Sequence, residues 1–279
     1  MVSQEQRRRQ LAREKFLRQQ QRRTDARRKA RTRNAAIASA IAVVLIGGLA
    51  LYTTDAFKGD DDKSNANAES TPSAPPTSGA PDPCEKPAAG KAKTETWEKE
   101  PAMSIDESAD YTMTLGTTCG DIDIALKASA APRTVNSFEF LTGKGYLDHT
   151  KCHRLTTNGI YVLQCGDPMG DGTGGPGYTI PDENLKDDSL KGKSYPAGTV
   201  AMANQYNAQT KEGRDSGGSQ FFLVYQDSPL PPDYTPFGTV SASGMKVLKK
   251  IAGAGENTGA GDGAPNATVV IDKATVTKS

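Results

Sequence analysis

Residues 151–167 read K-C-H-R-L-T-T-N-G-I-Y-V-L-Q-C-G-D, and residues 218–222 read G-S-Q-F-F. The apolar, strand-like runs of these two stretches contain polar side chains that can hold an amide, chiefly Arg154 and Gln164. A polar group on the inner face of a strand costs free energy unless it is paired or used. These two residues are therefore candidates for a binding or catalytic site.

Short strand-like runs continue on both sides of this stretch. Residues 111–115 and 121–126 alternate apolar and polar positions around a turn at 118–120, which predicts a hairpin. Further strands are expected at 159–164, 198–203, 220–224, 237–240 and 268–271.

Two helices are predicted among these strands. Over residues 132–141, Val135, Phe138 and Leu141 have helical spacing and Gly143 follows as a stop signal, and a second helix is expected over 245–252. Many short strands, two short helices and no regular alternation of strand and helix predict a mainly β fold, a small closed barrel.

The N-terminal part has a different composition. Residues 1–34 carry 13 Lys and Arg against 3 Asp and Glu, although the whole chain has a net charge of only +1. The uncharged run A-A-I-A-S-A-I-A-V-V-L-I-G-G-L-A-L-Y follows at 35–52. As a helix it would be about 27 Å long, close to the roughly 30 Å hydrocarbon core of a bilayer. We therefore predict a transmembrane helix over residues 35–54.

Two alternatives for this run are a buried core helix and a cleaved signal peptide. The basic region is much longer than a usual n-region, and the flank 52–55 offers only a poor small-residue cleavage site, which disfavours a signal peptide. By the positive-inside rule, residues 1–34 form a basic cytoplasmic tail and the rest is exported, which predicts a single-pass cell-membrane protein. A nucleic-acid-binding arm is the alternative for the tail, and membrane insertion argues against it.

Residues 55–104 are rich in Asp, Ser, Ala, Pro and Lys and almost lack large apolar residues. Such a segment cannot bury enough surface to offset the entropy of ordering it. We expect a disordered, low-complexity linker there, and one folded domain over residues 105–279.

Six segments of this domain resemble, in the same order, the motifs of the cyclophilin-type peptidyl-prolyl isomerases. They are His153-Arg154, V-L-Q-C-G-D at 162–167, the Gly-rich loop at 170–177, Met-Ala-Asn at 202–204, S-Q-F-F at 219–222 and Phe-Gly at 237–238. The resemblance runs from Tyr111 to the C-terminus, and its pattern is closest to the tethered, extracytoplasmic cyclophilins of actinobacteria. It implies a closed, antiparallel, eight-stranded β-barrel with two short helices.

The resemblance also implies roles for individual residues. Arg154 matches the catalytic arginine, and Gln164 matches the glutamine that holds it. The implied substrate-binding residues are Tyr161, Val162, Asn204, Gln220, Phe222, Leu230 and Tyr234. Pro229 and Tyr234 stand where cyclosporin-sensitive members often carry Trp and His, so the resemblance does not extend to drug sensitivity.

The implied activity is cis–trans isomerisation of X–Pro bonds in proline-containing polypeptides, during the folding of exported proteins. A different class of function is also open: a proline-peptide-binding chaperone or scaffold module with little turnover. No cofactor is expected. No metal is expected either, because His149 and His153, four apart in a strand, lie well separated. The protein is expected to be a monomer without a nucleic-acid partner.

Four cysteines in an exported domain suggest disulfides, for which three pairings exist. Cys152 and Cys165 flank the Arg and Gln of two strands that pair in the family. The resemblance therefore favours a Cys152–Cys165 bridge, with Cys84–Cys119 as the second, and free thiols are the alternative.

Overall fold

The computed structural model describes residues 81–279. The predicted basic tail, the predicted transmembrane helix and residues 55–80 of the predicted linker lie outside the described residues. Within the described part, no helix has both the length and the apolar character needed to cross a bilayer.

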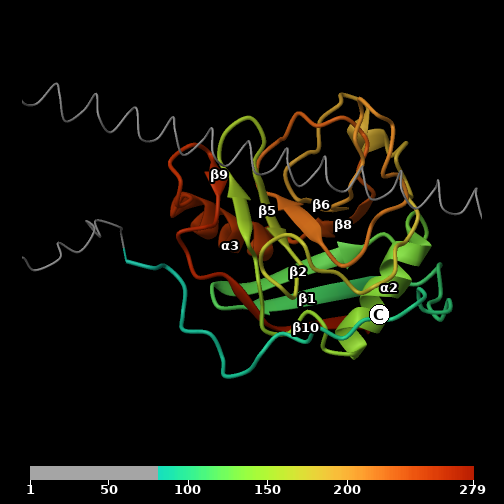
Figure 1. The fold of residues 1–279 in the computed structure, drawn as a ribbon, viewed down its shortest axis with the longest axis horizontal. Helices are drawn as coiled ribbons and strands as arrows, with labels where there is room; N and C mark the ends of the chain where they lie inside the picture. Colours follow the sequence, from blue (N-terminus) through green and yellow to red (C-terminus); the bar gives the residue numbers. More distant parts are fainter. Residues whose placement is uncertain (1–80) are drawn as a thin grey trace, which may run out of the picture. The chain divides into compact units, whose positions relative to one another are not determined.

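The described chain forms a mainly β fold with two α-helices (Figure 1). All ten strands belong to one curled antiparallel sheet, in the order β3-β10-β1-β2-β8-β6-β7-β5-β4-β9. The elements are β1 (Tyr111–Thr117), β2 (Gly120–Leu126), α2 (Pro132–Gly143), β3 (Thr150–Lys151), β4 (Arg154–Thr156), β5 (Val162–Cys165), the 3-10 turn η1 (Asp188–Leu190), β6 (Thr199–Met202), β7 (Phe221–Val224), β8 (Pro236–Val240), α3 (Ala242–Gly253), β9 (Asp262–Gly263) and β10 (Val270–Lys278).

The expected count of eight strands is wrong. Between β3 and β4 the backbone changes partner: the N–H of Cys152 donates to Val269 O (3.0 Å), and that of His153 donates to Gln164 O (3.1 Å). As a result β3 pairs with β10 and β4 pairs with β5, although only two residues separate them. The two-residue strand β9 adds the tenth. Residues 150–156 therefore connect β3, at one end of the sheet order, with β4, which lies next to β9 at the other end.

The predicted hairpin and helices are present, and their apolar faces form the core. In β1 and β2 the alternating apolar side chains are buried, and Val135, Phe138 and Leu141 of α2 are fully buried. The Phe138 ring stacks on Phe237 at 4.7 Å and meets Phe221 edge-on at 5.4 Å. This packing fixes the helix against β7 and β8, and β7 carries part of the site described below.

Helix α3 begins three residues earlier than the predicted range of 245–252. Ser241 is its N-cap, because the side-chain oxygen accepts a hydrogen bond from the N–H of Gly244 (3.1 Å). A serine in this position satisfies one of the backbone donors left free at a helix start.

Residues 82–104 differ from the disordered linker expected there, since they run along the surface of the domain and contact it (Figure 1, blue-green). The Trp97 ring packs against Phe140 (5.1 Å) and Tyr146 (5.6 Å). The backbone N–H of Trp97 donates to Pro176 O (2.8 Å). Near the end of this segment, the N–H of Ser104 donates to the Asn136 side chain (2.8 Å). The composition of this segment predicted disorder because it is of low complexity. Its ordering depends instead on one Trp and a few polar contacts. We call residues 82–104 the strap.

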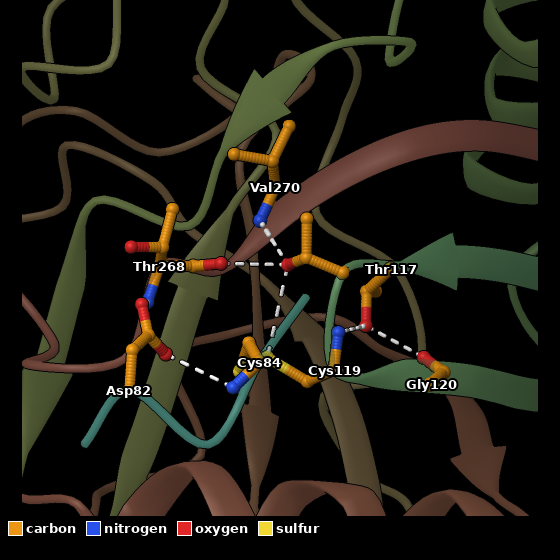
Figure 2. The surroundings of a disulfide bond; sticks show 8 residues. Asp82, Cys84, Thr117, Cys119, Gly120, Thr268 and Val270 are labelled. Carbon is orange, nitrogen blue, oxygen red and sulfur yellow. Dashed lines mark hydrogen bonds between the residues drawn. A yellow bond between two sulfur atoms is a disulfide. The ribbon is translucent and has the colours of Figure 1, made fainter. Parts of the chain in front are cut away.

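A disulfide fixes the start of the strap. The structure pairs Cys84 with Cys119 and Cys152 with Cys165, the pairing that the resemblance favoured. Figure 2 shows the first bridge, with the Asp82 carboxylate accepting from the N–H of Cys84 (3.0 Å). The other Asp82 oxygen accepts from the N–H of Thr268 (2.9 Å). The strap is therefore joined both to the β1–β2 turn and to the approach to β10.

Candidate active site

A small cavity lies where β4, β5 and β7 meet three loops, which are the β4–β5 loop, the loop after β6 and the β7–β8 loop. Its volume is about 220 Å³. This is less than the roughly 300–1,000 Å³ of pockets for drug-sized ligands, so it fits a group the size of one side chain. It is lined by Arg154, Ile160, Val162, Gln164, Ala203, Asn204, Phe222, Leu230 and Tyr234.

The base of the cavity is apolar and rigid. Phe222 and Val162 are almost fully buried, in a cluster separate from the main core. The Phe222 ring meets Tyr234 edge-on (5.4 Å) and Tyr195 (6.1 Å), and the Tyr195 hydroxyl donates to Tyr234 O (2.7 Å). Since aromatic rings packed in this way have little freedom to move, the cavity is preformed for an apolar group.

Strand register places two polar side chains at the cavity wall. Arg154 of β4 lies directly opposite Gln164 of β5. The Arg154 Nη1 donates to Gln164 Oε1 (3.3 Å), and Gln164 Nε2 donates to Gln220 Oε1 (3.0 Å). Gln220 Nε2 then donates to the carbonyls of Gly172 (3.1 Å) and Gly174 (2.9 Å). Hydrogen bonds therefore connect the guanidinium to the Gly-rich loop.

A second, larger cavity of about 690 Å³ adjoins the first and shares Gln164, Ala203 and Asn204 with it. The Gly-rich loop and Gln220 form its other side. The strap supports this loop from outside, because Trp97 donates to Pro176 at the loop's end. An extended chain bound in the small cavity could continue into the larger one.

Gly166 is required where β5 leaves the site. Its φ is +85°, and a Cβ there would lie 2.1 Å from the carbonyl oxygen of Ser219. A side chain would therefore push β5 away from the residues that lead into β7.

Asp262 of β9 is a site residue that the sequence analysis missed. Its carboxylate accepts from Arg154 Nε and Nη2, both at 2.7 Å. This ion pair lowers the pKa of Asp262 and raises that of Arg154. The two residues are 108 positions apart, and no motif or spacing in the sequence connects them.

Of the predicted substrate-binding residues, Val162, Asn204, Phe222, Leu230 and Tyr234 line the small cavity together. Gln220 lines the adjoining cavity instead and contacts Gln164.

Tyr161 does not line the cavity. Its ring packs against Tyr225 (5.9 Å), and Ile160 takes its place at the wall. Side chains along an extended chain alternate between faces, so residues 160, 162 and 164 share the site face and 161 points away. The period of two could have identified Ile160 from the sequence. Ala203 also lines the cavity, but no pattern in the sequence pointed to it.

Asn204 is held rather than free. Its Nδ2 donates to Asp233 O (2.7 Å), and its Oδ1 accepts from the N–H of Tyr206 (3.1 Å). Arg214, in the loop after β6, pairs with Asp182 and Asp233 beside it. These contacts fix the rim between the two cavities.

Comparison with known proteins gives a family match on the folded part of the chain described above. Residues 112–276 match the model of the family described as cyclophilin type peptidyl-prolyl cis-trans isomerase/CLD. A probable peptidyl-prolyl cis-trans isomerase B of Mycobacterium leprae is 44% identical over 198 residues, covering 68% of this chain and 61% of that protein. Its namesake from Mycobacterium tuberculosis is 45% identical over 173 residues, covering 59% and 54%. The chain thus spans less than two thirds of the length of these relatives.

Solved structures give the same fold. A cyclophilin type peptidyl-prolyl cis-trans isomerase of Cryptosporidium parvum superposes with a TM-score of 0.51 at 25% identity, covering 61% of this chain and 99% of that one. The same protein in the presence of the dipeptide Ala-Pro superposes with a TM-score of 0.50 at 26% identity, with 60% and 99% covered. The family match covers more than half of the chain and includes every residue that lines the small cavity. The chain therefore belongs to the cyclophilin-type peptidyl-prolyl cis-trans isomerase family.

Proposed function

We propose that the chain catalyses cis–trans isomerisation of X–Pro bonds in polypeptides. The observation that carries the proposal is the small apolar cavity with the Arg154 guanidinium at its wall. The apolar base formed by Phe222, Val162 and Leu230 suits a pyrrolidine ring, which is compact and has no donor to satisfy. The Ala-Pro dipeptide used with the Cryptosporidium relative supports a proline-containing ligand.

The chemistry requires neither a cofactor nor covalent attack. Rotation about a peptide bond has a barrier of about 18–20 kcal/mol, because amide resonance is lost on twisting. Around an X–Pro bond, uncatalysed exchange takes tens to hundreds of seconds. In the twisted amide the imide nitrogen regains a lone pair, to which an Arg154 N–H can donate. A donor that is fixed before the reaction stabilises this state more than either planar ground state.

The geometry gives the cavities and the polar residues separate roles. The cavity holds the proline ring still while the residue before it rotates on the solvent side. Gln164 and Asp262 hold the guanidinium at the wall, so the donor need not be ordered during the reaction. The adjoining cavity takes the chain on one side of the proline.

The direct test measures the relaxation of an Ala-Pro peptide bond with the full-length chain. We expect the relaxation rate to rise in proportion to protein concentration. Saturable binding of the peptide without acceleration would instead identify a binding module. Absence of both, in a folded protein, would overturn the proposal.

We also propose that the domain acts outside the cytoplasm on exported proteins, as a monomer anchored by residues 35–54. The charge asymmetry of residues 1–34 supports the orientation. The two disulfides of the domain support it independently, because such bonds persist mainly in oxidising compartments.

Protease added to intact cells tests this location. We expect digestion within residues 55–279, while an epitope placed before residue 34 stays protected until the cells are lysed. A domain that is protected in intact cells and digested only after lysis would contradict export.

A further inference from the structure

We infer that Asp262 is a positioning residue for catalysis, which acts by fixing the guanidinium of Arg154. The inference rests on the proposed function and adds to it a residue from a distant part of the chain. It starts from the paired contacts between Asp262 and the Nε and Nη2 of Arg154, each 2.7 Å long.

This pairing leaves some N–H donors of the Arg154 guanidinium free to bind substrate. A guanidinium has five N–H donors in a planar fork. Asp262 takes two along one edge and Gln164 takes one from Nη1. Two donors remain, and Arg154 lines the small cavity. Three bonds from two sides define the plane of the group as well as its position.

The turn that carries Asp262 is built around a buried carboxylate. Glu256 is 9% exposed, and its side chain accepts from the N–H of Thr258 (2.6 Å), the Thr258 hydroxyl (2.6 Å) and the N–H of Gly261 (2.8 Å). A Cβ on Gly263 would lie 2.4 Å from Glu256 Oε2, so a side chain there would displace the Glu256 carboxylate from these bonds. Asp262 is therefore presented by a preorganised turn rather than by a mobile loop.

The same turn is attached to the strand that carries Arg154. In β9, Asp262 lies opposite Thr156 and Gly263 lies opposite Leu155 of β4. The N–H of Thr157 also donates to Gly261 O (2.9 Å). Both members of the ion pair thus belong to one rigid unit, which sets their separation.

A role in stability alone does not explain this arrangement. The side chains of Arg154 and Asp262 are 40% and 53% exposed, and ion pairs with that exposure contribute little to folding. A long arginine side chain left without partners would sample many rotamers, and ordering it during catalysis would cost entropy. Asp262 removes most of that cost in advance.

The test compares Asp262→Asn with the parent, both as full-length chains, in the X–Pro relaxation assay. Asparagine keeps the size of the side chain but loses one acceptor and the charge. We expect kcat to fall about tenfold, with KM within twofold, because the apolar cavity still binds the proline. Asp106→Asn is the matched control: Asp106 also pairs with a cation, Lys278, at similar exposure, and lines neither cavity of the site. This control should keep the parent's kcat.

A double variant separates positioning from a general structural effect. If Asp262 acts through Arg154, Asp262→Asn should have no further effect on kcat in a chain that already carries Arg154→Ala. Equal loss in both backgrounds, or an unchanged or higher kcat in the single variant, would overturn the inference.

A spectroscopic measurement keeps the test independent of turnover. The Nε–H of Arg154 should give a distinct, slowly exchanging NMR signal in the parent that is lost in Asp262→Asn. A parent without isomerase activity that still shows this signal would contradict the proposed function while supporting the fixed guanidinium. A signal unchanged by the substitution would contradict the positioning role itself.

Discussion

Replacing Arg154 by alanine is expected to lower kcat/KM for X–Pro isomerisation by about 100- to 1,000-fold, the loss typical of removing a preorganised donor to a transition state. The apolar base of the cavity, formed by Phe222, Val162 and Leu230, is unchanged in this variant, so KM for the peptide should move much less than kcat. The readout is the concentration dependence of the peptide relaxation rate. The side chain is 40% exposed, so the folded state should survive the change.

Two further variants sharpen this prediction. Arg154→Lys keeps the charge but cannot form the paired contacts with Asp262, so it should recover only a small part of the lost rate. Arg133→Ala removes an arginine of similar exposure that pairs with Glu100 outside the site, and it should behave like the parent. Full activity in Arg154→Ala would refute the assignment of the catalytic centre.

Removing the Cys84–Cys119 bridge is expected to lower the free energy of unfolding by about 4 kcal/mol on the chain-entropy model. The cysteines are 35 residues apart, and cross-linking them restricts the unfolded chain. This is a large share of the roughly 5–15 kcal/mol that stabilises most domains. For a domain of this size, the melting temperature should drop by roughly 8–16 °C.

The variant for this test is Cys84→Ala/Cys119→Ala, which leaves no unpaired thiol from this bridge. Thermal unfolding gives the stability, and limited trypsin digestion at Lys91 and Lys93 reports on the strap. We expect faster cleavage there than in the parent, because the strap is then held without a covalent link, by the Trp97 packing, the Glu100–Arg133 ion pair and hydrogen bonds. A melting temperature equal to the parent's would show that the bridge adds nothing to the strap's own contacts.

Local patterns in the sequence were enough to predict the faces of most elements. The alternation in residues 111–126 identified a hairpin with its apolar side chains inward, and Val135, Phe138 and Leu141 are all buried on one face of α2. Such periodicities depend only on the geometry of a single strand or helix, so they are readable without knowing the partner. At Tyr161, where the family position was preferred to the period of two, the structure places Ile160 at the cavity wall instead.

The sequence also placed most of the site, through a resemblance whose motifs carry its residues in order. Arg154, Gln164, Val162, Asn204, Phe222, Leu230 and Tyr234 were all named from those motifs, and the structure brings them to one cavity. The strap escaped prediction because its contacts with Phe140, Tyr146 and Pro176 are made by few residues in a polar, proline-containing segment.

What remained for the tertiary structure was the pairing of groups far apart in the chain. The local pattern at Arg154 indicated a polar side chain on an inner strand face, but not the carboxylate 108 positions away that holds it. That pairing depends on β9 closing onto β4, and on the turn around Glu256 that presents Asp262. A two-residue strand in a glycine-rich turn has no periodicity to detect. Such a contact is set by the whole curled sheet, because its geometry exists only once every strand between the two residues is in place.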